Sequence, residues 1–261
     1  MTKEGVKPRI LSMFDSEADT YGVFQNKGLA LVSEFEKMLV LLRISNSSNS
    51  KSSILEIGCG WGRYLSEVSE SSLNRIGIDF SKRMLMAGKR KFPAIDFIRA
   101  DMEHLPLRDS SISLVYSVRA FKWVPNPLLV LKEVNRVCKK NGTVLLYEVN
   151  SSLSIDYLAK QVFNHVFFLP YRAAKPQFTL ATPFSTMKLF ETAGFHNVSY
   201  EGVLFLPLRF CTFSKNKTLL KILIDLEKIA AKMPLSDVFA YGLVYDGKQN
   251  TIENQTGRNF T

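Results

Sequence analysis

The sequence predicts an α/β fold in which a mostly parallel sheet carries helices on both faces. The first observation is that short apolar segments alternate with helical segments from residue 53 to residue 149, an order typical of parallel strands joined by helices. The second is that the segments SSILEI, RIGID and TVLLYEV are mostly apolar without strict alternation, as expected for strands covered on both faces. We therefore expect the sheet to lie at the centre of the molecule.

Length and composition favour one globular domain with a sizeable core. The chain has 261 residues, of which 46% are apolar and 22% charged, a profile typical of soluble proteins. It contains no run of about eighteen apolar residues and no apolar signal-peptide core at its N-terminus, so we expect a cytoplasmic protein. Cys59, Cys138 and Cys211 are odd in number and far apart, which favours neither a disulfide framework nor a zinc site.

The elements are predicted from periodicity, in order along the chain. Apolar residues recur at three- and four-residue intervals over residues 15–43, which predicts an amphipathic helix that ends at the polar loop ISNSSNSKSS. The chain end GKQNTIENQTGRNFT is predicted to be a disordered tail, above all over residues 251–261. The predicted strands are 53–58, 74–79, 95–99, 112–117, 143–149, 197–205 and 238–245, and the later predicted helices are 62–70, 81–91, 127–138, 183–193 and 216–233.

The segment ILEIGCGWGRYL places Gly58, Gly60 and Gly62 where a predicted strand turns into a helix. Glycine accepts positive φ and lets a ligand approach the backbone closely. In a parallel sheet this turn faces the crevice where ligands bind, and free amide groups make it mildly electropositive. A tight turn without a ligand is the alternative explanation.

Asp79 shifts the balance toward a ligand. It ends the next apolar strand, about twenty residues beyond the glycines, where an acid can accept hydrogen bonds from the hydroxyls of a ribose. The pattern G-x-G-x-G lacks the register of the dinucleotide pattern G-x-G-x-x-G. The sequence therefore predicts a ligand that contains a nucleoside, and it disfavours a nicotinamide cofactor and a dehydrogenase.

Four segments in order resemble the class I S-adenosylmethionine-dependent methyltransferases: LEIGCGWG, GIDFSKRML, RADMEHLPLRDSSISLVYSV and LLVLKEVNRVCKKNGTVLLYE. Within this family, the four segments are similar to those of the small-molecule branch, which includes the quinone- and biotin-pathway methyltransferases. The resemblance covers residues 10–150. It implies a three-layer Rossmann-like methyltransferase fold with a mostly parallel seven-stranded sheet, an antiparallel last strand and helical lid insertions.

The implied domain is a single methyltransferase domain over residues 1–250. Its cofactor-binding part is 10–150, and an acceptor lid with the C-terminal strands occupies 151–240. The resemblance implies S-adenosyl-L-methionine as the cofactor. The implied cofactor residues are Tyr21, Glu56, Gly58, Cys59, Gly60, Gly62, Asp79, Phe80, Met84, Asp101, Met102 and Ser117.

By resemblance, Glu56 and the backbone at 58–60 surround the amino acid portion, and Ser117 lies near the methionine end. At the other end, Asp79 holds the ribose and Phe80 packs on the adenine, while Asp101 accepts from the adenine amino group. The backbone N–H of Met102 donates to the ring, and Met84 packs against it. An acid that accepts from an exocyclic amine beside apolar groups is what adenine recognition requires. Core packing for Met84 and Met102, and a structural role for Tyr21, stay open.

Asn141 departs from the family pattern, because it replaces the first glycine in the turn before the fifth strand. Asn also tolerates the left-handed conformation, so we expect little effect.

Methyl transfer from a sulfonium is an in-line displacement, in which the protein positions the acceptor and removes its proton where required. No metal is needed. Of the three histidines, His165 lies in the aromatic segment that lids the acceptor pocket in this fold, and His104 lies in a loop. Both are candidate bases, although packing and a plain polar loop explain them as well. His196 is expected at the surface, and the catalytic residue stays unknown.

The leading hypothesis is methylation of a small, partly apolar acceptor by a monomer or homodimer. An RNA methyltransferase is an alternative, motivated by the net charge of +10, although solvated helix faces also explain the clustered Lys and Arg. Only VPNP stands where nucleic-acid amino-methyltransferases carry N-P-P-Y, which makes nucleic acid unlikely. A regulatory protein that binds the cofactor without catalysis is the other alternative.

The predicted helix 216–233 carries an apolar stripe that includes Leu223 and Leu226. Such a stripe must be covered. Three surfaces could cover it. The helix could pack on the body of the protein as part of an acceptor lid, it could contact a second subunit, or it could lie on a membrane surface with its lysines near anionic lipid.

Overall fold

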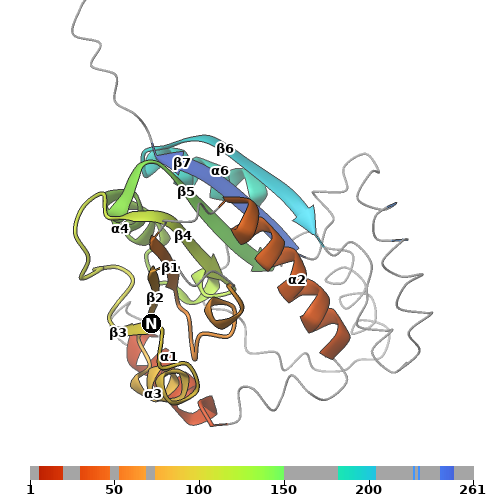
Figure 1. Ribbon diagram of the computed structural model, residues 1–261. Helices are drawn as coiled ribbons and strands as arrows, with labels where there is room; N and C mark the ends of the chain where they lie inside the picture. The colour runs from red at the N-terminus through yellow and green to blue at the C-terminus, as the bar shows by residue number, and fades with distance from the viewer. Residues whose placement is uncertain are drawn as a thin grey trace, which may run out of the picture.

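A computed structural model describes residues 6–19, 30–47, 53–68, 74–149, 182–203, 226, 229 and 242–249. Within these residues one seven-stranded sheet has the order β3-β2-β1-β4-β5-β7-β6 (Figure 1). Strands β1 to β5 pair in parallel, and β7 runs antiparallel to both β5 and β6. The strands are β1 (Ser53–Ile57), β2 (Asn74–Asp79), β3 (Asp96–Arg99), β4 (Ile112–Val118), β5 (Cys138–Val149), β6 (Phe195–Val203) and β7 (Gly242–Gln249).

Helices cover the sheet on both faces, which confirms the predicted three-layer fold. Val40 and Ile44 of α2 pack with Leu145 and Tyr147 of β5 on one face. The other face packs against α4 and α6, whose buried side chains include Val134. The helices are α1 (Val6–Glu17), α2 (Ala30–Ser47), α3 (Lys82–Lys91), α4 (Pro127–Val137) and α6 (Pro183–Thr192), with short 3-10 turns η3 (Leu65–Glu67) and η4 (Phe121–Trp123).

The N-terminal prediction was wrong in extent. Instead of one helix over 15–43, the structure has α1, which ends at Glu17, and α2, which begins at Ala30. Ala18 and Asp19 form a turn at the end of α1. The predicted helix 62–70 is also wrong, because Gly62 has φ +80° and only the short turn η3 forms after it.

The last strand lies later than predicted. Strand β7 occupies Gly242–Gln249 rather than 238–245, so the residues GKQ of the predicted tail lie in the sheet. Their polar composition gave no sign of a strand. Strand β7 nevertheless pairs with a strand on each side, and the side chain of Lys248 is exposed. Residues 251–261 lie outside the described part of the chain. Asn141 has φ +61°, which confirms that Asn tolerates the left-handed turn there.

The C-terminal elements share the core of the N-terminal ones. Phe190 of α6 is fully buried and lies 5.4 Å from Phe195 and 6.2 Å from Tyr245, between ring centroids. All three belong to the same hydrophobic cluster as Leu55 and Val115 of β1 and β4. The aromatic cluster therefore joins α6, β6 and β7 to the central sheet.

We expect Phe190→Ala to lower the free energy of unfolding by about 3–5 kcal/mol, because it leaves a large cavity in the core. Denaturant titration followed by circular dichroism measures the loss, and a single transition is expected. Phe184→Ala on the same helix is the matched control: its side chain is 67% exposed, so its effect should be below about 1 kcal/mol. Equal losses in the two variants would contradict the shared core.

Candidate functional site

A cavity of about 460 Å³ opens at the carboxyl ends of β1 to β4. Its walls come from α1, the loops that follow these four strands, and the start of α3. The predicted cofactor residues that line it are Glu56, Gly58, Cys59, Gly60, Asp79, Phe80, Met84, Asp101 and Met102. Gly62 and Ser117 do not line it, and Tyr21 lies outside the described residues.

The glycine loop adopts positive φ at each of its glycines, but each glycine has a different reason. A Cβ on Gly58 would lie 2.3 Å from the Cβ of Ala120, and one on Gly62 would lie 2.8 Å from the Phe97 ring. At Gly60 a Cβ would meet nothing within 4 Å. Packing therefore explains Gly58 and Gly62, whereas Gly60 leaves open space beside the cavity.

Asp79 holds this loop in place. Its carboxylate accepts the backbone N–H of Gly60 at 2.8 Å and that of Ser81 at 2.8 Å. Burial raises the pKa of Asp79, while these N–H donors lower it. The backbone N–H groups of Gly58 and Cys59 also donate to the carbonyl of Ile78. The end of β2 thus fixes the shape of the loop that follows β1.

Glu56 is a buried acid on the floor of the cavity. Its Oε2 accepts the Tyr116 hydroxyl at 3.1 Å and the backbone N–H of Leu65 at 3.2 Å. Burial raises the pKa of Glu56 to about 8, although both hydrogen bonds act in the other direction. Glu56 is therefore mostly protonated near neutral pH.

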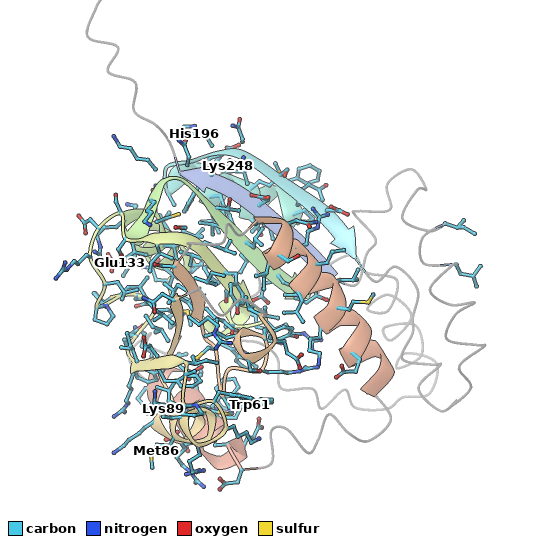
Figure 2. All side chains as sticks on the ribbon, in the orientation of Figure 1. Trp61, Met86, Lys89, Glu133, His196 and Lys248 are labelled. Atoms are coloured by element: carbon cyan, nitrogen blue, oxygen red, sulfur yellow. The ribbon has the colours of Figure 1, made fainter. Side chains whose placement is uncertain are left out.

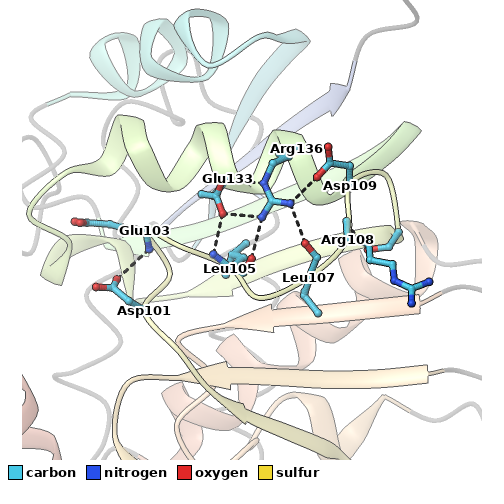
Figure 3. Close-up of polar contacts among 9 residues, drawn as sticks. Asp101, Glu103, Leu105, Leu107, Arg108, Asp109, Glu133 and Arg136 are labelled. Carbon is cyan, nitrogen blue, oxygen red and sulfur yellow. Dashed lines mark hydrogen bonds and ion pairs between the residues drawn. The ribbon is translucent and has the colours of Figure 1, made fainter.

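Lys7 of α1 was not predicted as a site residue. Its Nζ lies 2.6 Å from both Asp101 Oδ2 and Glu103 Oε2. The other oxygen of Asp101 accepts the backbone N–H of Glu103 at 3.0 Å (Figure 3), and the other oxygen of Glu103 accepts that of Asn126 at 3.2 Å. One lysine thus ties α1 to the loop after β3 and, through Glu103, to the start of α4.

Sequence reasoning missed α1, although a signal was present. Lys7, Ile10, Met13, Phe14 and Glu17 all line the cavity. Their spacing of three and four residues marks one face of a helix. The predicted helix began too late to include most of them.

Arg136 of α4 anchors the loop after β3 (Figure 3). Its guanidinium donates to the carbonyls of Leu105 and Leu107 and pairs with Asp109 and Glu133. Glu133 in turn accepts the backbone N–H of Leu105 at 2.8 Å, and Arg136 lowers the pKa of Glu133. The loop that begins at Asp101 is therefore held by the helix that follows β4.

The two described histidines lie away from the cavity lining. His104 is exposed, and its backbone N–H donates to the Asp101 carbonyl at 2.9 Å. His196 of β6 is exposed, as predicted, and Figure 2 shows it at the end of the molecule opposite Trp61. His165 lies outside the described residues. No catalytic base is identified among the described residues.

Comparison with known proteins identifies the family. A model of the methyltransferase domain matches residues 55–146. The demethylmenaquinone methyltransferase of Lysinibacillus sphaericus is 31% identical over 170 residues, which cover 58% of this chain and 73% of that protein. The chain belongs to the class I S-adenosylmethionine-dependent methyltransferases.

Other relatives match over shorter parts. Two malonyl-[acyl-carrier protein] O-methyltransferases, from Hamiltonella defensa and Marinomonas, are 38% and 34% identical over 36% and 60% of this chain. The chain spans only 37% and 57% of their lengths. A methyltransferase of Thermotoga maritima, described as a possible histamine N-methyltransferase, has a TM-score of 0.63 at 19% identity, over 92% of this chain and 99% of that one. This last likeness shows the fold alone.

Within the described ranges, no helix has the length and apolar character needed to cross a bilayer.

We expect Asp79→Asn to weaken binding of S-adenosylmethionine by about 1.5–3 kcal/mol, because it removes a charged hydrogen-bond acceptor. Isothermal titration calorimetry measures the loss. Asp96→Asn is the matched control, since Asp96 is an exposed acid on β3 and should leave the affinity unchanged. Unchanged affinity in Asp79→Asn would remove Asp79 from the ribose site.

Glu56 should make stability depend on pH. Because folding raises its pKa from 4.5 to about 8, the folded state holds the proton more tightly, and stability is lost as pH rises through this window. We expect Glu56→Gln to reduce the loss of unfolding free energy between about pH 5 and pH 8 by about 1–3 kcal/mol. Denaturant titration at the two pH values measures it, and an equal loss in both proteins would show that Glu56 ionises normally.

Proposed function

We propose that the protein transfers a methyl group from S-adenosylmethionine to a small, partly apolar acceptor. The observation that carries this proposal is the order of polar groups along the carboxyl edge of the sheet. Asp101 follows β3, Asp79 ends β2 and the glycine loop follows β1, and these strands are neighbours. The three positions match the adenine, ribose and amino acid parts of one extended cofactor.

The residues present fit this cofactor. The volume of about 460 Å³ lies in the usual range for ligand pockets. The open space beside Gly60 gives the amino acid part access to backbone, and Asp79 lines the same cavity with its carboxylate already oriented by two N–H groups. Met84, Met102 and Phe80 supply apolar surface near the adenine position.

The protein's own contribution to methyl transfer is to position the acceptor in line with the methyl group and to exclude water. S-adenosylmethionine supplies an electrophilic methyl group on a positively charged sulfur. With the adenine at β3, the methyl end of the cofactor would lie toward the loop after β4, which lines the cavity from Val118 to Pro125 with Phe121 excepted. Trp123 there packs edge-to-face on Phe14 of α1, with ring centroids 5.7 Å apart, so this wall is partly apolar.

The predicted acceptor lid, which shares residues 151–240 with the C-terminal strands, stays part of the proposal, and most of that range lies outside the described residues. Leu226 and Ile229 are described, and both are exposed, at 46% and 59%. These two side chains of the apolar stripe are therefore not buried on the body of the protein. Contact with an acceptor, a second subunit or a membrane surface would cover them.

The assay incubates the protein and methyl-labelled cofactor with small-molecule and RNA extracts. We expect label in the small-molecule fraction, as the named acceptors of the relatives suggest. Gly60→Asn is the negative control: Asn tolerates φ +55°, so the variant should fold, but its side chain fills space beside the cavity and should abolish both cofactor binding and transfer. Label found only in RNA would favour the alternative acceptor, and normal binding by the variant would place the cofactor elsewhere.

A further inference from the structure

Two cations lie on the turn that follows β4. Arg119 and Lys122 both line the cavity. Arg119 directly precedes Ala120, the N-cap of the 3-10 turn Phe121–Trp123, and Lys122 lies within that turn. The segment that follows β4 therefore places two cations on the lining of the cavity.

The turn is held in a fixed conformation. Arg119 has φ +60°, which costs a non-glycine residue about 1–2 kcal/mol, and its backbone N–H donates to the Tyr147 carbonyl at 2.8 Å. Two residues later, the backbone N–H of Phe121 donates to Glu148 Oε1 at 2.7 Å. Strained backbone that the surroundings maintain is typical of binding sites, so the placement of Arg119 is itself an indication of function.

The position of these cations separates them from the cofactor's adenosine. Strand β4 lies on the side of β1 opposite β2 and β3, so in the proposed binding mode Arg119 and Lys122 would flank the methyl end rather than the adenine end. Arg63 follows the glycine loop and also lines the cavity. Its guanidinium lies 3.7 Å from Glu34 Oε1. Arg63 follows β1, whereas Arg119 and Lys122 follow β4, on the side where the acceptor would bind.

A buried acid, Glu148, lies against the turn. Glu148 faces both cations from β5, and burial raises its pKa to about 7 even though Lys122 and Arg119 lower it. Glu148 carries at most one negative charge against the two positive charges of Arg119 and Lys122. Beside this charge lie the apolar side chains of Trp123, Val124 and Phe14.

We propose that Arg119 and Lys122 bind an anionic group of the acceptor, so that the acceptor is an amphiphilic acid with a carboxylate or phosphate next to an apolar body. This inference rests on the proposed function, because it names the acceptor class of the same site. The positive sulfonium of the cofactor would add to the attraction for such an anion, and low-dielectric walls strengthen both interactions.

The test uses decanoate, decyl phosphate and decanol as probes, with the protein saturated with S-adenosylhomocysteine. These probes share one apolar chain and differ in the charge and shape of the head group. By calorimetry at submicellar concentration, we expect at least one acid to bind tenfold or more tightly than decanol. A preference for decanoate over decyl phosphate, or the reverse, identifies the anionic group. Equal binding of all three probes would overturn the proposal.

Charge-neutral variants locate the site. Arg119→Gln with Lys122→Met should reduce the preference for the acid at least tenfold, whereas Arg119→Lys keeps the charge and should retain most of it. Lys132→Gln is the matched control, since Lys132 is an exposed cation of α4. Affinity for S-adenosylhomocysteine should stay within twofold in every variant, which also shows that the variants fold. An unchanged preference in the double variant would overturn the assignment to Arg119 and Lys122.

The proposed function can fail separately. If S-adenosylhomocysteine does not bind the unmodified protein, the proposed function is wrong. The same probes titrated into the protein alone then still report whether the two cations select an anion.

Discussion

The hydrogen bonds between the end of β2 and the glycine loop are the constraint on which the candidate site depends. A chain with three positive-φ glycines between residues 58 and 62 would by itself be flexible, because glycine has the largest conformational freedom. Asp79 and the carbonyl of Ile78 accept three backbone N–H groups of this loop. The residue proposed to bind the ribose therefore also shapes the loop proposed to receive the amino acid part, and both belong to one rigid unit at the edge of the sheet.

Buried carboxylates perform the same task elsewhere around the cavity. Glu56, Glu103 and Glu148 are 2%, 7% and 4% exposed, and each accepts the backbone N–H of a segment that leaves the sheet, at Leu65, Asn126 and Phe121 respectively. Chain that leaves a sheet loses the hydrogen bonds of the ladder, and a buried N–H without a partner is costly. A carboxyl oxygen accepts such an N–H, and the hydrogen bond is stronger where the acid is ionised. Desolvation of the acid is the opposing effect, and it raises the pKa of Glu56 and Glu148.

The sheet and the polar groups at its edge could be predicted from sequence because they depend on local patterns. Unbroken apolar segments mark covered strands, and Asp79 ends such a segment. The glycine spacing likewise marks the turn, although only the structure separates Gly60, which leaves open space, from Gly62, which makes room for Phe97. The side chain that requires a glycine at 62 comes from a strand about thirty-five residues away in the chain, and no local pattern contains that information.

The parts of the candidate site that could not be predicted from sequence depend on contacts between segments far apart in the chain. Lys7 and Glu103 are 96 residues apart in sequence, and neither carries a local sign that the two meet. Their ion pair matters because Glu103 also holds the start of α4, so the wall made by α1 and the wall made by the β4 loop share one buried acid. The edge-to-face contact of Phe14 with Trp123 joins the same two walls by apolar packing. A ligand that displaced α1 would therefore have to break an ion pair at the proposed adenine end and an aromatic contact at the proposed acceptor end, which couples the two ends of the cavity through one helix.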